Sequence, residues 1–382
     1  MGFHEFSSPY DWSRIAAYKR TAKAAFGGMI DLSVGSPVDP VPDSVRKALA
    51  VAANDPNAYG YPATAGTADL RAAIAEWFSA ARNVDLQAIH ADVVPTVGSK
   101  EGVALMASLL HFGEDDVVVQ PKVSYPTYEI GTQLAGAQVL KVDDVADVAS
   151  WRNVPGVKAV WVNSPCNPTG EVYSAERMAG IVAAAREIGA VVLSDECYAL
   201  MQWRGATNSA DDDPLQSTPC ALRSDVCAGS AEGVLVLYSL SKQSNMAGYR
   251  TAFIAGDESL IASMSAYRKQ IGQIIPGPVQ AAMAAGLRDL ESVKVQHARY
   301  RERLGVLVSA LRAYGYCTDM PDSALYVWVR AKSGDCWTDM EQLAKIGIIA
   351  SPGEFYGAPE CLRFSATASD EAIASAAERL AR

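Results

Sequence analysis

The sequence predicts an α/β protein with two parts: a large domain with a mostly parallel, seven-stranded sheet between helices, and a smaller α+β domain. Two observations lead to this prediction. Short apolar runs alternate with helical stretches between about residues 92 and 257, which is the pattern of βαβ units covered on both faces. A Pro-Gly-Pro sequence at 276–278 then interrupts that pattern.

The strands of the large domain are predicted from seven short runs rich in β-branched and other apolar residues. These runs are Val93–Val97, Val117–Gln120, Gln138–Val142, Ala159–Asn163, Ala190–Ser194, Val234–Tyr238 and Thr251–Ala255. Amphipathic helices are expected between several of them, as at Lys100–His111 and Ala175–Ile188. Residues 204–232, with several Asp, Ser and Gly, are predicted to form a surface excursion between the fifth and sixth strands.

The C-terminal third predicts the smaller domain, which also draws on the N-terminal segment. A long helix is expected from Val279 to about Tyr314, followed by strands near Tyr326–Val329 and Cys361–Phe364. We therefore divide the chain into three ranges. Residues 1–40 form an N-terminal arm and part of the small domain, 41–280 the large domain, and 281–382 the small C-terminal domain.

Charge and composition argue against several classes of partner. The net charge of −10, from 33 Lys and Arg against 43 Asp and Glu, disfavours nucleic acid and anionic membranes. No stretch approaches ~18 uninterrupted apolar residues, and the N-terminus lacks the features of a secretory signal. Seven cysteines without a Cys-x-x-Cys pair, and four histidines without ligand spacing, predict a reduced, cytoplasmic protein with no metal site.

Polar side chains directly follow four of the predicted strands. Ser99 follows the first strand, Asn167 the fourth, Asp195 and Tyr198 the fifth, and the segment Ser239–Lys242 the sixth. In open α/β sheets, ligands bind outside the carboxyl ends of the strands. We therefore expect these side chains to meet in one ligand site.

Lys242 has the most specific chemistry in this set. A lysine whose pKa is lowered by burial or by neighbouring cations becomes a nucleophile toward carbonyl carbons. Alone it would be interpreted as a surface lysine, but the hydroxyls of Ser239 and Ser241 and the guanidinium of Arg250 could hold a phosphate dianion. A lysine beside a phosphate site predicts pyridoxal 5'-phosphate (PLP), held as a Schiff base.

Asp195 ends an apolar strand, where a carboxylate is unfavourable unless it is paired. A lone Asp more often caps a helix. If Asp195 instead meets a pyridine nitrogen, the contact is worth roughly 4 kcal/mol at an effective dielectric constant of ~20, or about three pKa units. That interaction would keep the ring nitrogen of PLP protonated.

Four further positions have both a structural and a functional interpretation. Asn167 and Tyr198 are predicted to donate hydrogen bonds to the ring oxygen of PLP, although Asn-Pro-x-Gly alone is usually a turn. Ser99 either caps a helix or binds phosphate at that helix N-terminus, and the two roles are compatible. Tyr125 belongs to the core or stacks on the cofactor. Arg363, between apolar residues, either forms an internal salt bridge or grips a substrate carboxylate.

Taken together, the motifs Asn167–Gly170, Ser194–Tyr198 and Ser239–Lys242, with Arg250, resemble those of the fold-type-I PLP enzymes, specifically the class I/II aminotransferases. The resemblance covers the whole chain. It implies that Lys242 carries PLP and acts as the catalytic base, and that the other residues named above have their functional roles. A PLP-dependent lyase or decarboxylase is an alternative on the same fold. A PLP-sensing regulator is a second, disfavoured because no basic DNA-binding segment is present.

The resemblance also implies features that the residue pattern does not show. Tyr61 matches a tyrosine that reaches across a dimer interface to the partner's phosphate, which implies a homodimer with shared active sites. Gly35 matches the N-terminal loop that closes over substrate. Lys100 is placed with the cofactor-binding residues, although many relatives carry an uncharged polar residue there. The bonds Asn167–Pro168 and Tyr125–Pro126 are expected to be cis.

A narrower resemblance concerns the substrate. Four segments are similar to those of actinobacterial succinyldiaminopimelate aminotransferases: Asp31–Pro40, Tyr61–Thr67, Ser241–Arg250 and Ser351–Gly357. The similarity implies transamination between N-succinyl-LL-2,6-diaminopimelate and 2-oxoglutarate in lysine biosynthesis. An aspartate/alanine or broad-specificity aminotransferase, or a C–S lyase, remains as an alternative, because no residue in these segments identifies the distal part of the substrate.

Overall fold

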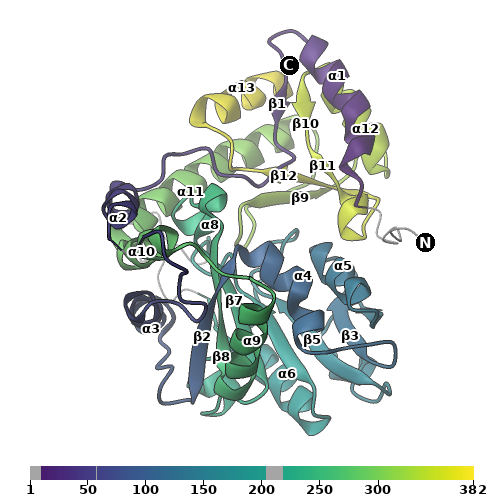
Figure 1. The fold of residues 1–382 in the computed structure, drawn as a ribbon. Coiled ribbons are helices and arrows are strands. Elements are labelled where there is room, and N and C mark those ends of the chain that lie inside the picture. Colours follow the sequence, from purple (N-terminus) through teal and green to yellow (C-terminus); the bar gives the residue numbers. More distant parts are fainter. Residues whose placement is uncertain (1–9, 57, 204–217) are drawn as a thin grey trace, which may run out of the picture.

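The structure, a computed structural model, describes residues 10–56, 58–203 and 218–382. Figure 1 shows a sheet with its helices in the lower half and a smaller α+β body in the upper half, where the chain also ends. The fold class predicted from the sequence is confirmed.

The lower body is built on one seven-stranded sheet. Its strands are β2 (Ala91–Val97), β3 (Val117–Pro121), β4 (Gln138–Val142), β5 (Val157–Asn163), β6 (Val191–Asp195), β7 (Val234–Ser239) and β8 (Thr251–Asp257). Their order is β2-β8-β7-β6-β5-β3-β4, and only β8 runs antiparallel to its neighbours. All seven predicted runs are strands of this sheet.

Helices cover both faces of the sheet. They are α2 (Asp43–Ala53), α3 (Ala68–Arg82), α4 (Ser99–Leu109), α5 (Thr127–Leu134), α6 (Ala175–Glu187), α7 (Ser224–Cys227), α8 (Leu240–Gln243), α9 (Glu258–Gln270) and α10 (Gly277–Arg288). Because side chains alternate along a strand, Val160 packs with α3, α6 and α10 on one face, while Trp161 packs with α4 and α9 on the other. This two-sided burial explains why the strands are apolar at nearly every position.

The upper body combines the two ends of the chain. It contains α1 (Ala16–Ala24), β1 (Ile30–Asp31), α11 (Leu290–Ala313), β9 (Tyr326–Arg330), α12 (Cys336–Lys345), β10 (Ile348–Ile349), β11 (Ser351–Pro352), β12 (Cys361–Ser365) and α13 (Asp370–Leu380). Strands β11, β12 and β9 form one antiparallel sheet. Strand β1 pairs in parallel with β10, which fixes the N-terminal segment to the C-terminal one.

Two predictions about the chain between these bodies were wrong. The expected helix from Val279 to Tyr314 is two helices, α10 and α11, separated at Asp289, whose carboxylate accepts from the backbone N–H of Ser292 as an N-cap. Of the expected surface excursion, 204–217 lie outside the described residues, and 218–232 alternate between exposed positions, such as Ser224 and Asp225, and buried ones. Cys220 and Leu222 are fully buried there because their apolar side chains join the core on one face of the sheet.

The cis-proline predictions have a mixed outcome. The Asn167–Pro168 bond is cis, as predicted, whereas Tyr125–Pro126 is not among the cis bonds of the described residues, so that prediction was wrong. Ser164–Pro165 is also cis and was not predicted. Among the described helices, none is long and apolar enough to cross a lipid bilayer.

Candidate active site

The strand ends of the large sheet and the upper body together enclose a cavity of about 360 Å³. Strands β5, β6 and β7 point their carboxyl ends toward it. Because β8 is antiparallel, its first residue, Thr251, lies at the same end and pairs with Val97 at the end of β2. This topology brings Arg250, just before β8, beside the start of α4.

The structure brings nearly all of the predicted site residues into this cavity. Those that line it are Gly35, Ser99, Lys100, Tyr125, Asn167, Asp195, Tyr198, Ser239, Ser241, Lys242, Arg250 and Arg363. Tyr61 does not line the cavity, and its side chain is fully exposed. The role predicted for each of these residues stays a prediction.

Sequence reasoning missed several residues that also line the cavity: Tyr10, Trp12, Val34, Cys197, Ala247, Tyr326 and Tyr356. Tyr326 begins a predicted strand and Tyr356 lies in a segment used for the narrower resemblance, but neither position carried a signal of its own. Tyr10 and Trp12 belong to the N-terminal arm, which packs against Phe355. Only the folded structure places that arm beside the strand ends.

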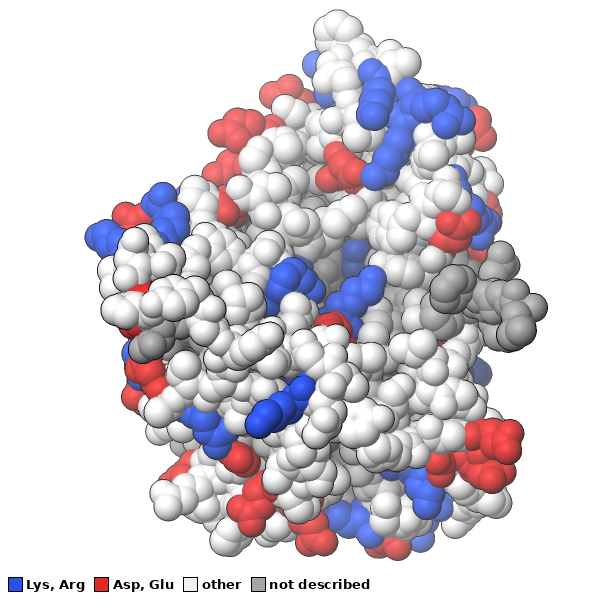
Figure 2. Space-filling model, in the orientation of Figure 1, with Lys and Arg blue, Asp and Glu red and all other residues white. Residues whose placement is uncertain are grey.

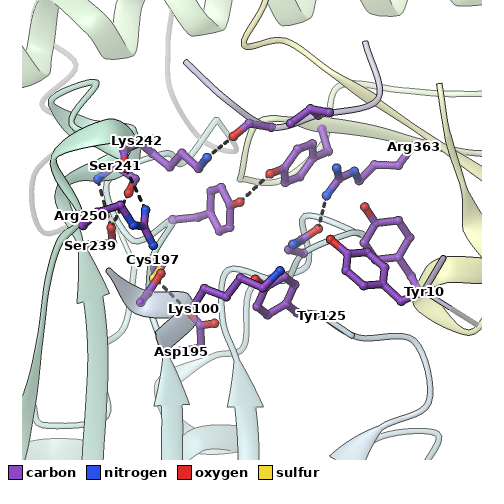
Figure 3. A pocket seen from close by; sticks show the side chains of 18 of the residues that line it. Tyr10, Lys100, Tyr125, Asp195, Cys197, Ser239, Ser241, Lys242, Arg250 and Arg363 are labelled. Atoms are coloured by element: carbon purple, nitrogen blue, oxygen red, sulfur yellow. Dashed lines mark hydrogen bonds between the residues drawn. The ribbon is translucent and has the colours of Figure 1, made fainter. Parts of the chain in front are cut away.

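Lys242 lies on the short helix α8, directly after β7, and Figure 3 shows it pointing into the cavity. Its Nζ donates a hydrogen bond to the backbone oxygen of Gly35 in the N-terminal loop. Burial lowers the pKa of the Lys242 ammonium, and the cations Arg363 and Arg250 lower it further. The lowered pKa makes the neutral, nucleophilic amine more available.

A corner of the cavity beside Lys242 is suited to an anion (Figure 3). The hydroxyls of Ser239 and Ser241 lie 2.7 Å apart, and Arg250 donates to the backbone oxygen of Ala247 at 2.8 Å. Gly98, at φ 77°, precedes the N-terminus of α4, and a Cβ there would collide with the Arg250 guanidinium. The glycine therefore lets the guanidinium approach the free N–H groups of that helix N-terminus.

Asp195 closes the opposite side of the cavity at the end of β6. Its Oδ2 accepts a hydrogen bond from the Tyr128 hydroxyl at 2.8 Å, and its Oδ1 accepts from the Cys197 backbone N–H at 3.1 Å. Burial raises the pKa of the Asp195 carboxyl. A cation bound next to this carboxylate would reverse that shift, so the site favours a positively charged group against Asp195.

Arg363, on β12, is buried and held in place from several sides. It donates to Asn167 Oδ1 at 2.7 Å and to the Ser33 backbone oxygen at 2.9 Å. Its guanidinium carbon lies 3.9 Å from the ring centroid of Tyr326 and 4.7 Å from that of Tyr356. No described carboxylate forms an ion pair with Arg363, and its Nε is buried without a partner. The internal salt bridge considered above is therefore not formed within the described chain.

The charge balance of the cavity favours an anionic ligand. Four cationic side chains line it, Lys100, Lys242, Arg250 and Arg363, and none forms an ion pair in the parts of the chain that the structure describes. Asp195 is the single carboxylate among the described residues that line it. Figure 2 shows Lys and Arg side chains around the hollow in the middle of this face. Groups of three or more His, Cys, Asp or Glu suited to a metal are absent from the described ranges.

The donor set fits PLP group by group. The corner at Ser99, Ser239, Ser241 and Arg250 matches a phosphate dianion, Lys242 matches the aldehyde, and Asp195 matches the ring nitrogen. An α/β fold that places these groups at one edge of its sheet defines an enzyme of the PLP-dependent class.

The family model for "Aminotransferase class I and II" matches residues 27–380, and the chain belongs to this family, whose cofactor is PLP. The chain is therefore a transaminase. It is 40% identical to the 4-dedimethylamino-4-oxo-anhydrotetracycline transaminase OxyQ of Streptomyces rimosus, covering 97% of this chain and 98% of that one. It is 39% identical to a probable aminotransferase of Mycobacterium tuberculosis, covering 97% and 84%.

Solved structures of aminotransferases have the same fold as this chain. A probable N-succinyldiaminopimelate aminotransferase from Thermus thermophilus superposes with a TM-score of 0.80 and is 27% identical, covering 97% of this chain and 99% of that one. A Thermus thermophilus aspartate aminotransferase variant superposes with a TM-score of 0.82 at 24% identity, covering 100% and 99%. The fold is therefore that of the aminotransferases.

Proposed function

We propose that this transaminase moves the amino group between N-succinyl-LL-2,6-diaminopimelate and 2-oxoglutarate, in lysine biosynthesis and in the cytoplasm. The observation that carries the proposal is a surplus cation. Arg363 accounts for a substrate α-carboxylate and Arg250 for a phosphate, yet Lys100 also lines the cavity without an ion-pair partner in the described chain. Lys100 was predicted above to bind the cofactor, and we propose that it binds the substrate instead. A substrate whose distal arm carries carboxylates would use this third cation.

Two further observations support a long substrate with a distal anionic group. Lys100 Nζ lies 5.4 Å from the ring centroid of Tyr10, so the N-terminal arm and α4 form one wall of the cavity. Tyr10 and Trp12 supply flat apolar surface for the methylene groups of such a substrate. Resemblance to succinyldiaminopimelate aminotransferases in four separate segments, and the 27% identical Thermus thermophilus protein, favour the same substrate.

In the proposed mechanism, bound PLP supplies an electron sink for the bond electrons at the substrate Cα. Lys242 Nζ would accept the proton from the substrate Cα and would then donate a proton to the cofactor carbon that receives the amino group. Its lowered pKa suits this role, because a base must be neutral to accept a proton. The Asp195 carboxylate holds a proton on the ring nitrogen, which keeps the sink effective.

The remaining residues would bind and orient the substrate and the cofactor. Arg363 grips the α-carboxylate through a planar, bidentate guanidinium that Asn167 and the ring of Tyr326 hold in place. Asn167 and Tyr198 would donate to the ring oxygen of PLP, and the Tyr125 ring would supply a flat apolar surface for the PLP ring. Gly35 closes the N-terminal loop over the substrate and excludes water from Lys242. We also propose that the chain is divided into an N-terminal arm with part of the small domain (1–40), a large PLP-binding domain (41–280) and a small C-terminal domain (281–382).

A substrate comparison tests the proposed function, and a Lys100 variant sharpens it. We expect kcat/KM with 2-oxoglutarate to be highest for N-succinyl-diaminopimelate, above aspartate, alanine and aromatic amino acids. Lys100→Gln should lower kcat/KM about 10- to 100-fold for the succinylated substrate, because one charge-assisted contact is lost, and leave alanine unchanged. The exposed Lys158→Gln is the matched control. Equal rates for all amino donors would instead indicate a broad-specificity aminotransferase.

We also propose a homodimer in which Tyr61 reaches the phosphate site of the partner. The support is exposure: Tyr61 is fully exposed and Tyr59 is 90% exposed, although aromatic rings favour burial.

Tyr61→Ala should weaken PLP binding about 10-fold or more, and Lys242→Ala should be inactive. Co-expression of the two variants gives hybrid dimers with one intact site, so about a quarter of the wild-type activity should return at limiting PLP. No recovery in purified hybrid dimers would show that Tyr61 serves its own subunit.

A further inference from the structure

Tyr326 lies at the centre of the candidate site, and the scheme above gives its hydroxyl no role. It is the first residue of β9, its backbone pairs with Ser365 of β12, and its side chain is 2% exposed. The ring lies 3.9 Å beneath the Arg363 guanidinium, and the hydroxyl lies 2.6 Å from that of Tyr198. One side chain from the upper body therefore contacts both the carboxylate-binding arginine and a tyrosine of the lower body.

The hydroxyl of Tyr326 also faces the N-terminal loop. A Cβ on Gly35 would collide with it, so the loop lies directly on this oxygen, and Lys242 donates to the same Gly35 from the other side. The charged and titratable groups of the described chain that face Tyr326 include Lys242, Arg363, Tyr198, Cys197, Tyr356 and Tyr300. Tyr326 is thus enclosed by the residues that are expected to meet both cofactor and substrate.

The direction of the hydrogen bond between the two tyrosines follows from counting hydrogens. Each tyrosine hydroxyl carries one hydrogen and can also accept. If Tyr198 donates its hydrogen to the ring oxygen of PLP, it can only accept from Tyr326. The result is two hydrogen bonds in series, from the Tyr326 hydroxyl to Tyr198 and from the Tyr198 hydroxyl to the cofactor. Each of these hydrogen bonds polarises and so strengthens the next.

The Arg363 guanidinium beside Tyr326 strengthens this series of hydrogen bonds. In the protein without cofactor, burial alone would raise the pKa of the Tyr326 hydroxyl, but the charges of Arg363 and Lys242 and the hydrogen bond with Tyr198 lower it. Arg363 remains as a cation when Lys242 carries PLP. A more acidic hydroxyl is a stronger donor. Burial and the neighbouring Tyr326 raise the pKa of Tyr198, which therefore keeps its hydrogen to donate.

We propose that Tyr326 is a positioning residue that connects the substrate carboxylate site at Arg363 with the cofactor oxygen site at Tyr198. Its ring orients the guanidinium, and its hydroxyl polarises the Tyr198 donor. This inference rests on the roles proposed above for Arg363 and Tyr198, but not on which amino acid is the substrate.

The expected consequence is a change in the pKa of the Lys242 nitrogen once this residue carries PLP. A donor to the ring oxygen of PLP would stabilise negative charge on that oxygen, and so would favour the form in which the Lys242 nitrogen has lost its proton. Removing the Tyr326 hydroxyl should therefore raise the pKa read from the visible absorption of enzyme-bound PLP by about 0.5–1 unit, the equivalent of one ordinary hydrogen bond.

Three variants of the PLP-loaded enzyme separate the two contacts of Tyr326. Tyr326→Phe keeps the ring against Arg363 and removes the hydroxyl, so the spectroscopic pKa should rise while KM for amino acids stays near that of the wild type. Tyr326→Leu removes both, so the pKa should rise and KM should increase about 10-fold, the equivalent of one cation–ring contact. Tyr356→Phe is the matched control, because its hydroxyl contacts Ser351 at 3.1 Å and not Tyr198. It should leave the titration unchanged.

Each readout has an outcome that would overturn the inference. An unchanged spectroscopic pKa in Tyr326→Phe, with wild-type PLP content and unfolding temperature, would show that the hydroxyl does not act through Tyr198. An equal rise in Tyr356→Phe would show a general effect of losing a buried hydroxyl. If the wild type showed no absorption of lysine-linked PLP, the assignment of the PLP site itself would be wrong. The proposed function and the proposed role of Tyr326 would then both be rejected.

Discussion

Replacing Lys242 by alanine is expected to lower the rate of transamination about 10⁴-fold or more. The amine is both the nucleophile that holds the cofactor and the base that moves the Cα proton, and general base catalysis alone contributes about 10²- to 10⁴-fold. The phosphate corner and Asp195 do not depend on this side chain, so the variant should still bind PLP without a covalent link. Single-turnover reaction with glutamate, followed through 2-oxoglutarate release and PLP absorbance, measures both properties.

The control for this prediction is a lysine outside the cavity. Lys158→Ala removes an exposed side chain and should react like the wild type. A small amine added to Lys242→Ala should restore part of the rate, because it supplies a neutral base in the space that the side chain leaves. Wild-type turnover in Lys242→Ala would reject the assignment of the lysine altogether.

Much of this site could be predicted from the sequence because its residues lie at the ends of strands. Asn167, Asp195 and Lys242 each follow a buried run closely, and the topology of a parallel sheet brings such ends together. The position of Arg250 depends on β8 being antiparallel, which its apolar pattern does not reveal. The sequence placed Arg250 at the phosphate site through its nearness to Ser239–Lys242 in the chain, and not through the direction of β8.

The residues that could not be predicted are those that long-range packing brings to the cavity. Tyr10 and Trp12 come from an arm that is held by Phe355, more than 300 residues away in the chain. Tyr326 is one of many apolar positions in a short strand, and its function as proposed depends on contacts to Arg363 and Tyr198. Local pattern predicts which face of an element is buried but not which distant side chain it meets.

Two of the predictions that differ from the structure have identifiable physical causes. The helical pattern continues across residue 289, but the Asp289 carboxylate caps a new helix there and divides the expected helix in two. The polar composition around residues 204–232 suggested a surface segment. In its second half, Cys220 and Leu222 decide the conformation, because burying a few apolar side chains outweighs the average polarity of the segment.

The Asp195→Asn substitution tests whether charge or only hydrogen bonding at the end of β6 supports catalysis. Asparagine has nearly the same shape and one acceptor oxygen, which can accept from Tyr128 but then leaves the Cys197 backbone N–H facing an amide NH2. It cannot hold a proton on the ring nitrogen of PLP. A charge pair worth roughly 4 kcal/mol corresponds to about 10³-fold in rate, so we expect kcat to fall by about that factor. Steady-state kinetics at saturating PLP and circular dichroism measure activity and folding together.

Tyr128→Phe is the matched control for this substitution, because it removes the hydrogen bond to the same carboxylate and leaves the charge. A hydrogen bond to a charged acceptor contributes about 1.5–3 kcal/mol, so we expect kcat to fall by no more than about 10- to 100-fold. Burial raises the pKa of Asp195 in the protein without cofactor, and an adjacent ring cation opposes this shift. The ionised Asp195 is therefore maintained by the cofactor as much as by Tyr128. Equal losses in the two variants would show that hydrogen-bond geometry, and not charge, is what Asp195 supplies.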